Sequence, residues 1–357
     1  MFEQFLAHYE LLKQVPFVLF VIILAFVFEG TNGFHDAPNS IALMVKTKVM
    51  SYRKAIVWAA FWNFAATWFV GTAIANTVAK WIFPEFVTPE VIGAGLIGAI
   101  VWNLATWAKG IPSSSSHALL GGFGGAAIAM AGTAHGVMHM EKVYMIIAFI
   151  FLSPVAGSWI SLWLLRIIRM KAPPTEQNTS GSLAKVMQIV SSAAYSCGHG
   201  ANDSQKTMGI IAALLYCSIL KSDQAAFMAG TAKFPSWIIF ACYACMALGT
   251  LMGGRRIMNT MTDDITNDIN PRSAATIGVS AAVVLFASQA LGIPVSTTHA
   301  INGSIVGAAM ENHPISEIYW KKILEIGYTW VITLPGAGLV AALAYWVIMY
   351  FRTTHAA

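Results

Sequence analysis

Residues 111–128 read IPSSSSHALLGGFGGAAI, and residues 293–310 read IPVSTTHAINGSIVGAAM. Nine of the 18 aligned positions are identical, at a constant offset of 182 residues. A second pair of similar segments precedes them in the same order, because NGFHD at 32–36 aligns with HGAND at 199–203. Two matching motifs in the same order predict an internal repeat, and this repeat decides the fold.

The composition indicates that the lipid bilayer is the main solvent of the chain. Of its 357 residues, 57% are hydrophobic and 10% are charged, and the mean hydropathy is +0.65. A soluble globular protein usually carries about 25% charged residues, so this chain has too few charges to cover a water-facing surface. We therefore predict an all-α, polytopic membrane protein. The apolar segments lie at 16–45, 54–82, 90–109, 111–132, 143–168, 183–219, 227–253, 273–292, 293–310 and 323–350.

Two of these segments contain a polar interruption. The first meets GTNGFHDAPNS at 30–40, and the second meets SCGHGANDSQKTMG at 196–209. Irregular backbone at membrane depth survives only where protein buries it or where it lines a wet cavity. We expect both segments to be broken helices, and we expect the Pro-Ser-rich turns of the repeat to form re-entrant helical hairpins.

Each half of the chain carries one interrupted helix followed by one Pro-Ser-rich turn. We expect a first repeat over residues 1–170, a short central linker over 171–183 and a second repeat over 184–357. Each repeat has five crossings, and an odd number places the second copy upside down relative to the first. Secondary transporters with inverted repeats are built in this way, with their sites at the repeat interface near the bilayer midplane.

The basic residues predict an orientation. With ten crossings and an external N-terminus, the cytoplasmic loops carry 14 of the 21 Lys and Arg residues. This asymmetry agrees with the positive-inside rule. We expect a multi-pass protein of the inner (plasma) membrane with both termini outside, and we attribute the net charge of +5 to these loops rather than to nucleic-acid binding.

Asp36 and Asp203 are the first candidates for a functional role. A carboxylate within a membrane span costs about 2.5–3.5 kcal/mol on insertion scales, so it marks a functional site by default. Together with Asn32, Asn39 and Asn202, the two aspartates form an oxygen-rich set that suits a hard monovalent cation such as sodium. A carboxylate could carry a proton instead, and the alternative without function is a structural pair that plugs broken helix ends.

Two clusters of hydroxyl side chains follow the Ile-Pro pairs of the repeat. A Pro near a helix start and hydroxyls at its cap indicate a helix N-terminus, whose free N–H donors and positive dipole bind oxyanions. Two such ends related by a pseudo-twofold axis would hold one tetrahedral anion from both sides, whereas ordinary N-capping is the alternative. The candidate anion-binding hydroxyls belong to Ser114, Ser115, Ser116, Ser296, Thr297 and Thr298.

Lys206 lies three residues after Asp203 and is expected to neutralise that aspartate or to face the anion. In either role it helps to hold the net charge of a low-dielectric site near zero. We therefore count Lys206, Asp36 and Asp203 with the hydroxyls as candidate substrate ligands.

Four histidines, His35, His117, His199 and His299, fall within the same motifs. They either relay protons or hydrogen-bond to interrupted backbone, and we favour the structural role for His117 and His299. No close pair of them has the spacing of metal ligands, and the four cysteines lack a His or carboxylate at ligand spacing. Apart from sodium at the Asp and Asn side chains, we expect no metal, and we expect no cofactor.

These motifs resemble those of the PiT family of inorganic phosphate transporters. The similar stretches are NGFHDAPNSIA at 32–42, WNLATW at 102–107, IPSSSSH at 111–117, GHGANDSQKTMG at 198–209 and IPVSTTH at 293–299. The resemblance implies uptake of phosphate coupled to sodium or protons by alternating access. It also implies a homodimer, in which a moving transport part works against a scaffold.

The resemblance also implies roles for individual residues. The cation-binding carboxylates and amides of the family fall on Asp36, Asn39, Asn202 and Asp203. Its anion-binding hydroxyls fall on Ser114, Ser115, Ser296 and Thr297.

A sulfate permease of the same fold is the alternative substrate assignment. Near neutral pH phosphate keeps at least one hydroxyl that donates a hydrogen bond, and sulfate has none. An ionised carboxylate only accepts hydrogen bonds. If Asp36 or Asp203 touches the anion, protonated phosphate is therefore tolerated and sulfate is repelled.

Two other classes of protein compete with a secondary transporter. An intramembrane serine hydrolase would pair one nucleophile with one base, but here the Ser-His cluster occurs twice and no single nucleophile stands apart. An anion channel would let phosphate pass without concentrating it. Since the sequence contains no GxxxxGK[ST] loop, the energy for transport must come from an ion gradient rather than from a nucleotide. We therefore predict that the chain is not an enzyme.

Overall fold

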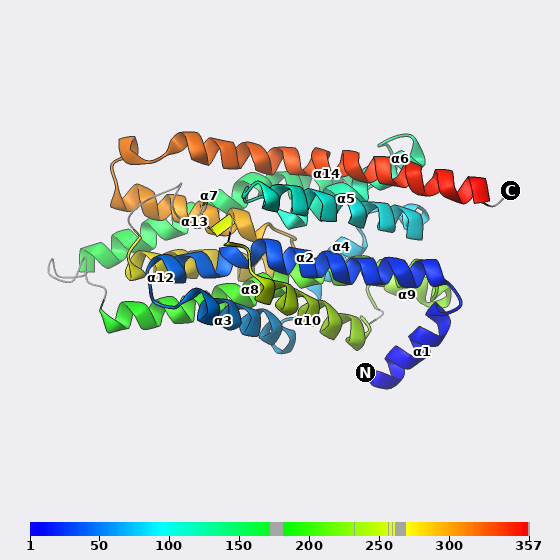
Figure 1. The fold of residues 1–357 in the computed structure, drawn as a ribbon, viewed down its shortest axis with the longest axis horizontal. Helices are drawn as coiled ribbons and strands as arrows, with labels where there is room; N and C mark the ends of the chain where they lie inside the picture. The colour runs from blue at the N-terminus through cyan, green and yellow to red at the C-terminus, as the bar shows by residue number, and fades with distance from the viewer. Residues whose placement is uncertain (172–180, 232, 256, 259, 261–268, 356–357) are drawn as a thin grey trace.

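The computed structural model describes every residue except 172–180, 232, 256, 259, 261–268 and 356–357. Within the described residues the regular structure is helical, apart from one isolated β-bridge between Ile82 and Met138. The long helices lie roughly along one axis of the molecule, and α1 (Phe2–Leu12) projects from one end (Figure 1). The prediction of an all-α architecture is confirmed.

The other helices follow in chain order. They are α2 (Pro16–Lys46), α3 (Tyr52–Ala65), α4 (Ala73–Ala79), α5 (Pro89–Ala108), α6 (Ser115–Ala131), α7 (Met140–Lys171), α8 (Ser182–Ser218), α9 (Gln224–Ala229), α10 (Ser236–Met252), α12 (Pro271–Leu291), α13 (Thr297–Asn312) and α14 (Trp320–His355).

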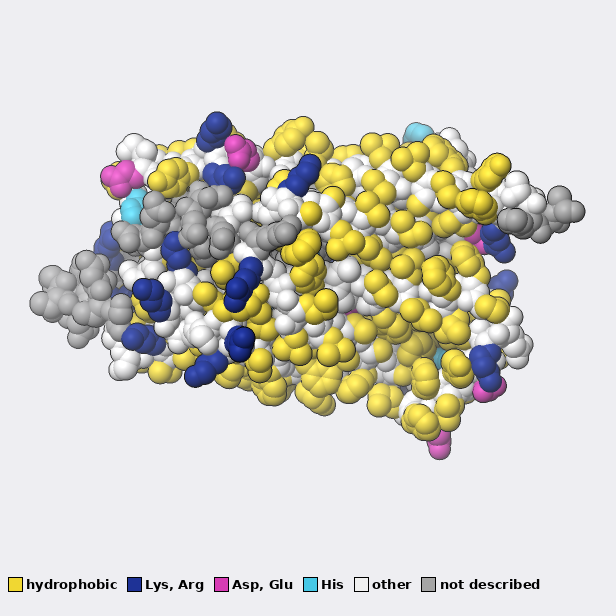
Figure 2. Space-filling model, in the orientation of Figure 1, with side chains coloured by type: hydrophobic (Ala, Val, Ile, Leu, Met, Phe, Trp, Pro, Cys, Tyr) yellow, Lys and Arg dark blue, Asp and Glu magenta, His cyan; other side chains and the backbone are white. Residues whose placement is uncertain are grey.

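Helix length and surface both fit a membrane protein. Five described helices, α2, α5, α7, α12 and α14, are long and apolar enough to cross a membrane, and two bent helix pairs raise this number to as many as seven. Large apolar side chains such as Phe61, Trp159 and Leu339 are more than half exposed. Figure 2 shows hydrophobic side chains over the middle of the molecule, with Lys and Arg gathered mainly at one end. Lipid is the solvent that accepts such a surface.

The two polar stretches do not break their helices. Helices α2 and α8 run continuously through residues 30–40 and 196–209, and α2 contains Pro38 in its interior. The broken helices predicted there were therefore misplaced. Side chains of these stretches reach neighbouring helices, as Asn39 does to Thr298 and Gln205 does to the backbone of Ile74. The bends fall elsewhere, with angles of 84° between 52–68 and 73–79 and 106° between 182–218 and 221–229.

Two hairpins carry the hydroxyl clusters, and they share one local construction. Helices α5 and α12 each begin with Pro after a capping side chain, Thr88 or Asn270. In the turns that follow, Gly110 and Gly292 adopt left-handed φ values of 68° and 65°, which glycine accepts without a steric penalty. An Ile-Pro pair then prevents the helix from continuing, and a serine cap starts α6 or α13.

The return helix of each hairpin packs on a helix from the other half of the chain. Helix α6 packs against α14, and α13 packs against α7. Both contacts use a GxxxG pair, Gly121 with Gly125 in α6 and Gly303 with Gly307 in α13. A Cβ atom built on Gly121 would lie 2.3 Å from the backbone oxygen of Leu334. Small residues permit this close backbone approach, so the two halves interlock through their hairpins.

Candidate functional site

The two predicted aspartates converge on one histidine in the interior of the molecule. Asp36 on α2 and Asp203 on α8 are 2% and 0% exposed. Nε2 of His199 lies 3.4 Å from Oδ2 of Asp203 and 4.0 Å from Oδ2 of Asp36. The carboxylates from the two halves of the chain therefore face the same imidazole.

Asp36 is bound by groups from its own helix and from the first hairpin. Its Oδ1 lies 2.6 Å from Nδ1 of His35 and accepts a hydrogen bond from Ser115 at 3.2 Å. The other ring nitrogen of His35 lies 3.1 Å from Oγ1 of Thr106, which belongs to α5. This network fixes the carboxylate of Asp36 against the N-terminus of α6.

Asp203 contacts both hairpins at once. Its Oδ1 accepts hydrogen bonds from Lys206 at 2.6 Å and from Ser116 at 3.3 Å, while its Oδ2 accepts one from Thr297 at 3.3 Å. Lys206, only 1% exposed, also donates to Ser116 at 2.5 Å and to the carbonyl of Val295 at 2.7 Å. One buried ion pair thus joins the first turns of α6 and α13.

The hydroxyl clusters divide into caps and inward-facing groups. The side chains of Ser114 and Ser296 accept hydrogen bonds from the backbone N–H groups of His117 and His299, at 3.2 and 3.3 Å. These two serines are therefore N-caps, which is the alternative to anion binding that the motif left open. The residues that follow them, Ser115, Ser116 and Thr297, reach the aspartates instead.

The remaining candidates take different places around this centre. Asn39 donates to the hydroxyl of Thr298 at 3.0 Å, so it links α2 to the second hairpin. Asn202 donates to the carbonyls of Gly198 and Leu285, and its Oδ1 accepts from Ser288. Its amide is therefore used to tie α8 to α12. Asn32 is buried, and no hydrogen bond joins it to either aspartate in the described part of the chain.

Asp36, His199 and Asp203 together form a group that could hold one cation. One ligand atom from each lies within 4.8 Å of the other two. The sequence analysis considered only spacing along the chain, so it did not anticipate that His199 lies with the two aspartates. Carboxylate oxygens are ligands that suit a hard cation.

Several side chains of the site had no clear signal in the sequence. Oδ1 of Asn63 lies 3.1 Å from Nδ1 of His199, and Tyr195 donates to the carbonyl of Thr297 at 3.2 Å. Thr106 was marked only as part of WNLATW, where a hydroxyl lies in an apolar helix. Glu29, which precedes the first polar stretch, is fully buried and accepts a hydrogen bond from Thr207 on α8.

His117 and His299 have a packing role in the structure. Their rings contact each other with centroids 4.8 Å apart, and His299 stacks on Trp330 at 4.0 Å. These contacts join the two hairpins to each other and to α14. They are packing contacts between rings, whereas the structural role predicted for both residues was hydrogen bonding to interrupted backbone.

An apolar helical bundle with charged and hydroxyl side chains gathered in its interior is the arrangement expected of a membrane transporter. Comparison with known proteins gives the family. The sequence model described as "Phosphate transporter family" matches residues 32–176 and 170–341, so the chain belongs to this family. It is a phosphate transporter and not an enzyme.

Individual relatives agree with this assignment. The chain is 42% identical over 331 residues to a probable low-affinity inorganic phosphate transporter of Rhizobium meliloti (strain 1021), with 92% of this chain and 96% of the relative covered. It is 36% identical over 333 residues to a protein of the same description from Bacillus subtilis (strain 168), with the same coverage. A solved structure described as "The sodium-dependent phosphate transporter" matches the fold with a TM-score of 0.77 at 20% identity, covering 94% of this chain and 99% of that one.

Proposed function

We propose that this chain takes up inorganic phosphate together with sodium ions or protons, at a site shared by two inverted repeats that open alternately to the two sides of the membrane. The observation that carries the proposal is the position of Asp203. Its carboxylate binds the first turns of both hairpins, through Ser116 and Thr297, and faces Asp36 across His199.

The charges of the site explain why a cation should accompany the anion. Two aspartates and one lysine carry a formal charge of −2 + 1 = −1 when the histidines are neutral, and Glu29 adds a further carboxylate nearby. An anion entering this buried group alone would increase an uncompensated negative charge, which a low-dielectric interior penalises strongly. A cation between Asp36, His199 and Asp203 removes that penalty. Phosphate binding and cation binding therefore favour each other.

The helix ends supply the groups for the anion. The N-termini of α6 and α13 meet near Asp203, and each presents free N–H donors and hydroxyls. Lys206 lies between them and adds a positive charge. When phosphate binds, Ser115, Ser116, Thr297 and Thr298 can exchange their present partners for phosphate oxygens. The capping serines Ser114 and Ser296 hold the two helix ends in place.

The aspartates also favour phosphate over sulfate. Each is an acceptor of hydrogen bonds when ionised, so it accommodates the hydroxyl of protonated phosphate and repels fully deprotonated sulfate. Sodium is the coupling ion that we place first, because the carboxylate and hydroxyl oxygens around Asp36 and Asp203 are ligands of a hard cation. The solved relative with the same fold is itself described as a sodium-dependent phosphate transporter.

The proposed inverted repeat is supported by the way the halves pack. Helix α6 packs on α14 in the second half of the chain, just as α13 packs on α7 in the first half. The corresponding glycines of the two GxxxG pairs, Gly121 with Gly303 and Gly125 with Gly307, are 182 residues apart. Both chain ends lie toward the end opposite the gathered basic side chains (Figures 1 and 2). By the positive-inside rule, this arrangement supports the proposal that both termini lie outside the plasma membrane. A homodimer is part of the same proposal, by family analogy.

Uptake of labelled phosphate into proteoliposomes tests the proposal. Sodium and pH gradients are imposed separately while the membrane potential is clamped. A coupled transporter concentrates phosphate under at least one gradient, and excess arsenate inhibits uptake more than excess sulfate does. Equilibration without accumulation would indicate a channel, and equal inhibition by sulfate and arsenate would contradict the substrate assignment. Liposomes without protein and liposomes with the Asp203→Asn variant are the controls.

A further inference from the structure

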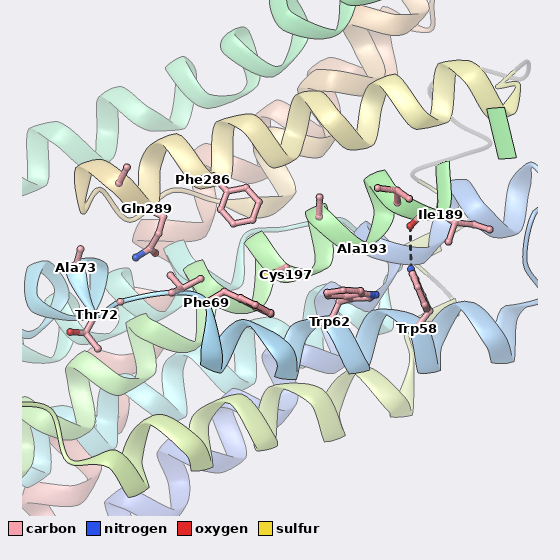
Figure 3. Close-up of a pocket in the computed structure, with 15 residues that line it drawn as sticks. Trp58, Trp62, Phe69, Thr72, Ala73, Ile189, Ala193, Cys197, Phe286 and Gln289 are labelled. Atoms are coloured by element: carbon pink, nitrogen blue, oxygen red, sulfur yellow. Dashed lines mark hydrogen bonds between the residues drawn. The ribbon is translucent and has the colours of Figure 1, made fainter. Parts of the chain in front are cut away.

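A large apolar groove lies apart from the aspartate site. Its volume is about 920 Å³, and it is bordered by α3, the connection at 69–72, α8 and α12. Trp58, Trp62, Phe69, Cys197 and Phe286 are among its lining residues (Figure 3). Ligand pockets have volumes of roughly 300–1,000 Å³ and are predominantly apolar. The groove therefore has the size and chemistry to hold an apolar molecule.

Two lysines mark one end of this groove. Helices α3 and α8 run parallel here, because Nε1 of Trp58 donates to the carbonyl of Ile189 at 3.3 Å and Asn63 bonds His199 further along. Lys54 precedes Trp58 by four residues, and Lys185 precedes Ile189 by four residues. Residues four apart share a helix face, so both lysines lie one turn beyond the lining residues, at the same level.

The charges of these lysines are free for a ligand. Both side chains are exposed, and neither has an ion-pair partner in the described part of the chain. Both residues lie near the starts of α3 and α8, which begin toward the same end of the molecule (Figure 1), and Lys and Arg side chains gather at that end (Figure 2). An anionic group placed between them would lie directly above an apolar groove.

The length of the groove corresponds to one leaflet of a bilayer. Lys185 and Cys197 are twelve residues apart on α8, which is about 18 Å along the helix at 1.5 Å per residue. Half of a hydrocarbon core is about 15 Å. The tryptophans beside the lysines fit the same depth, since Trp is enriched at the membrane interface.

We propose that this groove binds one anionic phospholipid, with its phosphate between Lys54 and Lys185 and an acyl chain against Trp62, Phe69 and Phe286. The lysines select a negative headgroup, and the groove selects a lipid over free phosphate. The occupant thus belongs to the leaflet at the basic end of the molecule.

The groove is also connected to the transport site. Gln289 lines the groove, and its Oε1 accepts a hydrogen bond from Gln205 at 2.9 Å. Gln205 in turn accepts from the backbone N–H of Ile74 at 3.0 Å, and it precedes Lys206 in α8. A bound lipid therefore packs against the residues that hold the site-bearing part of α8, and we expect anionic lipid to stimulate phosphate uptake.

The test uses phosphatidylglycerol with a photoreactive group in its acyl chain, mixed into phosphatidylcholine vesicles that contain the purified protein. After irradiation, peptide mass spectrometry locates the labelled residues. We expect labelling within 58–73, 189–197 and 286–290, and we expect Lys54→Gln with Lys185→Gln to reduce it about tenfold, since each lysine contributes to binding an anionic surface. The matched control, Lys109→Gln with Lys321→Gln, removes two exposed charges, at the end of α5 and on α14, and should leave labelling unchanged.

Three outcomes would overturn the proposal. A phosphatidylcholine probe that labels the same residues equally well would remove the role of the lysines. Competition by inorganic phosphate would show that the headgroup pocket binds the free ion. A second variant, Ala193→Phe, fills the groove wall. It should abolish labelling while elution from size exclusion stays the same, whereas retained labelling in a variant that elutes unchanged would show that the groove holds no lipid chain.

Discussion

At the scale of single residues, the buried pair of Asp203 and Lys206 holds the site together. Both side chains are almost completely inaccessible, and the pair reaches Ser116, Thr297 and the carbonyl of Val295. Removing one partner of a buried pair is costly because it leaves the other charge uncompensated, whereas removing both is often tolerated. The contribution of this pair to the stability of the protein can therefore be measured separately from its contribution to transport.

We predict that Lys206→Gln lowers the free energy of unfolding by about 3 kcal/mol, because it leaves Asp203 unpaired. The double variant with Asp203→Asn should recover most of this loss but should not recover phosphate uptake. Thermal unfolding in detergent and uptake by proteoliposomes measure the two quantities. A double variant that transports like the wild type would show that the pair is only structural.

The sequence allowed the aspartates and hydroxyls to be predicted because they recur in two copies. A carboxylate in an apolar membrane helix also carries a high free-energy cost, so its presence indicates a function. In contrast, Asn63 and Tyr195 enter the site only through packing between distant segments. Nothing in their local sequence distinguishes them from ordinary polar residues of a helix. For the same reason, the sequence did not indicate that His199 lies with Asp36 and Asp203.

At the scale of secondary-structure elements, the hairpins place two helix N-termini against the aspartates. The turns were predictable, because Gly, Ile-Pro and a hydroxyl cap occur in that order in both copies. The continuity of α2 and α8 was not predictable from polarity. Polar residues in a membrane helix indicate an interior partner, and that partner can be a side chain rather than exposed backbone.

The first turns of α6 and α13 should determine the affinity for phosphate. We predict that Ser115→Ala and Thr297→Ala each raise the KM for phosphate about two- to tenfold, as expected for loss of one hydrogen bond to a charged group. Expression and thermal unfolding should change little. An unchanged KM in both variants would exclude these hydroxyls from the binding site. Thr353→Ala is the matched control, because this exposed hydroxyl on α14 bonds carbonyls of its own helix.

The interlocking helix contacts give an independent prediction. A Cβ atom on Gly307 would lie 2.0 Å from the backbone oxygen of Ser158, whereas one on Gly327 would meet nothing within 4 Å. We therefore predict that Gly307→Val destabilises the protein by about 1–3 kcal/mol or more through overpacking. Gly327→Val should be close to neutral. Thermal unfolding of the two variants in the same detergent makes the comparison, and equal stability would contradict the close packing of α13 on α7.

At the scale of the whole molecule, two halves of the chain contribute equivalent parts to one centre. The first half supplies Asp36 and the hydroxyls of α6, and the second supplies Asp203, Lys206 and Thr297. The return helix of each hairpin packs on a helix of the other half of the chain. A movement of either half therefore changes the geometry of the centre. Secondary transporters with inverted repeats place their sites at the interface of the two halves. Composition was sufficient to predict the all-α membrane architecture, and the inverted repeat stays a prediction.

Equilibrium binding measures the linkage between phosphate and its coupling cation without the later steps of transport. Binding of labelled phosphate to the purified protein is followed while sodium concentration and pH are varied independently. We predict that one of these cations raises phosphate affinity, and that Asp36→Asn and Asp203→Asn each abolish this dependence in protein that remains folded. Phosphate binding that is independent of both cations, or a dependence that survives in both variants, would contradict the account.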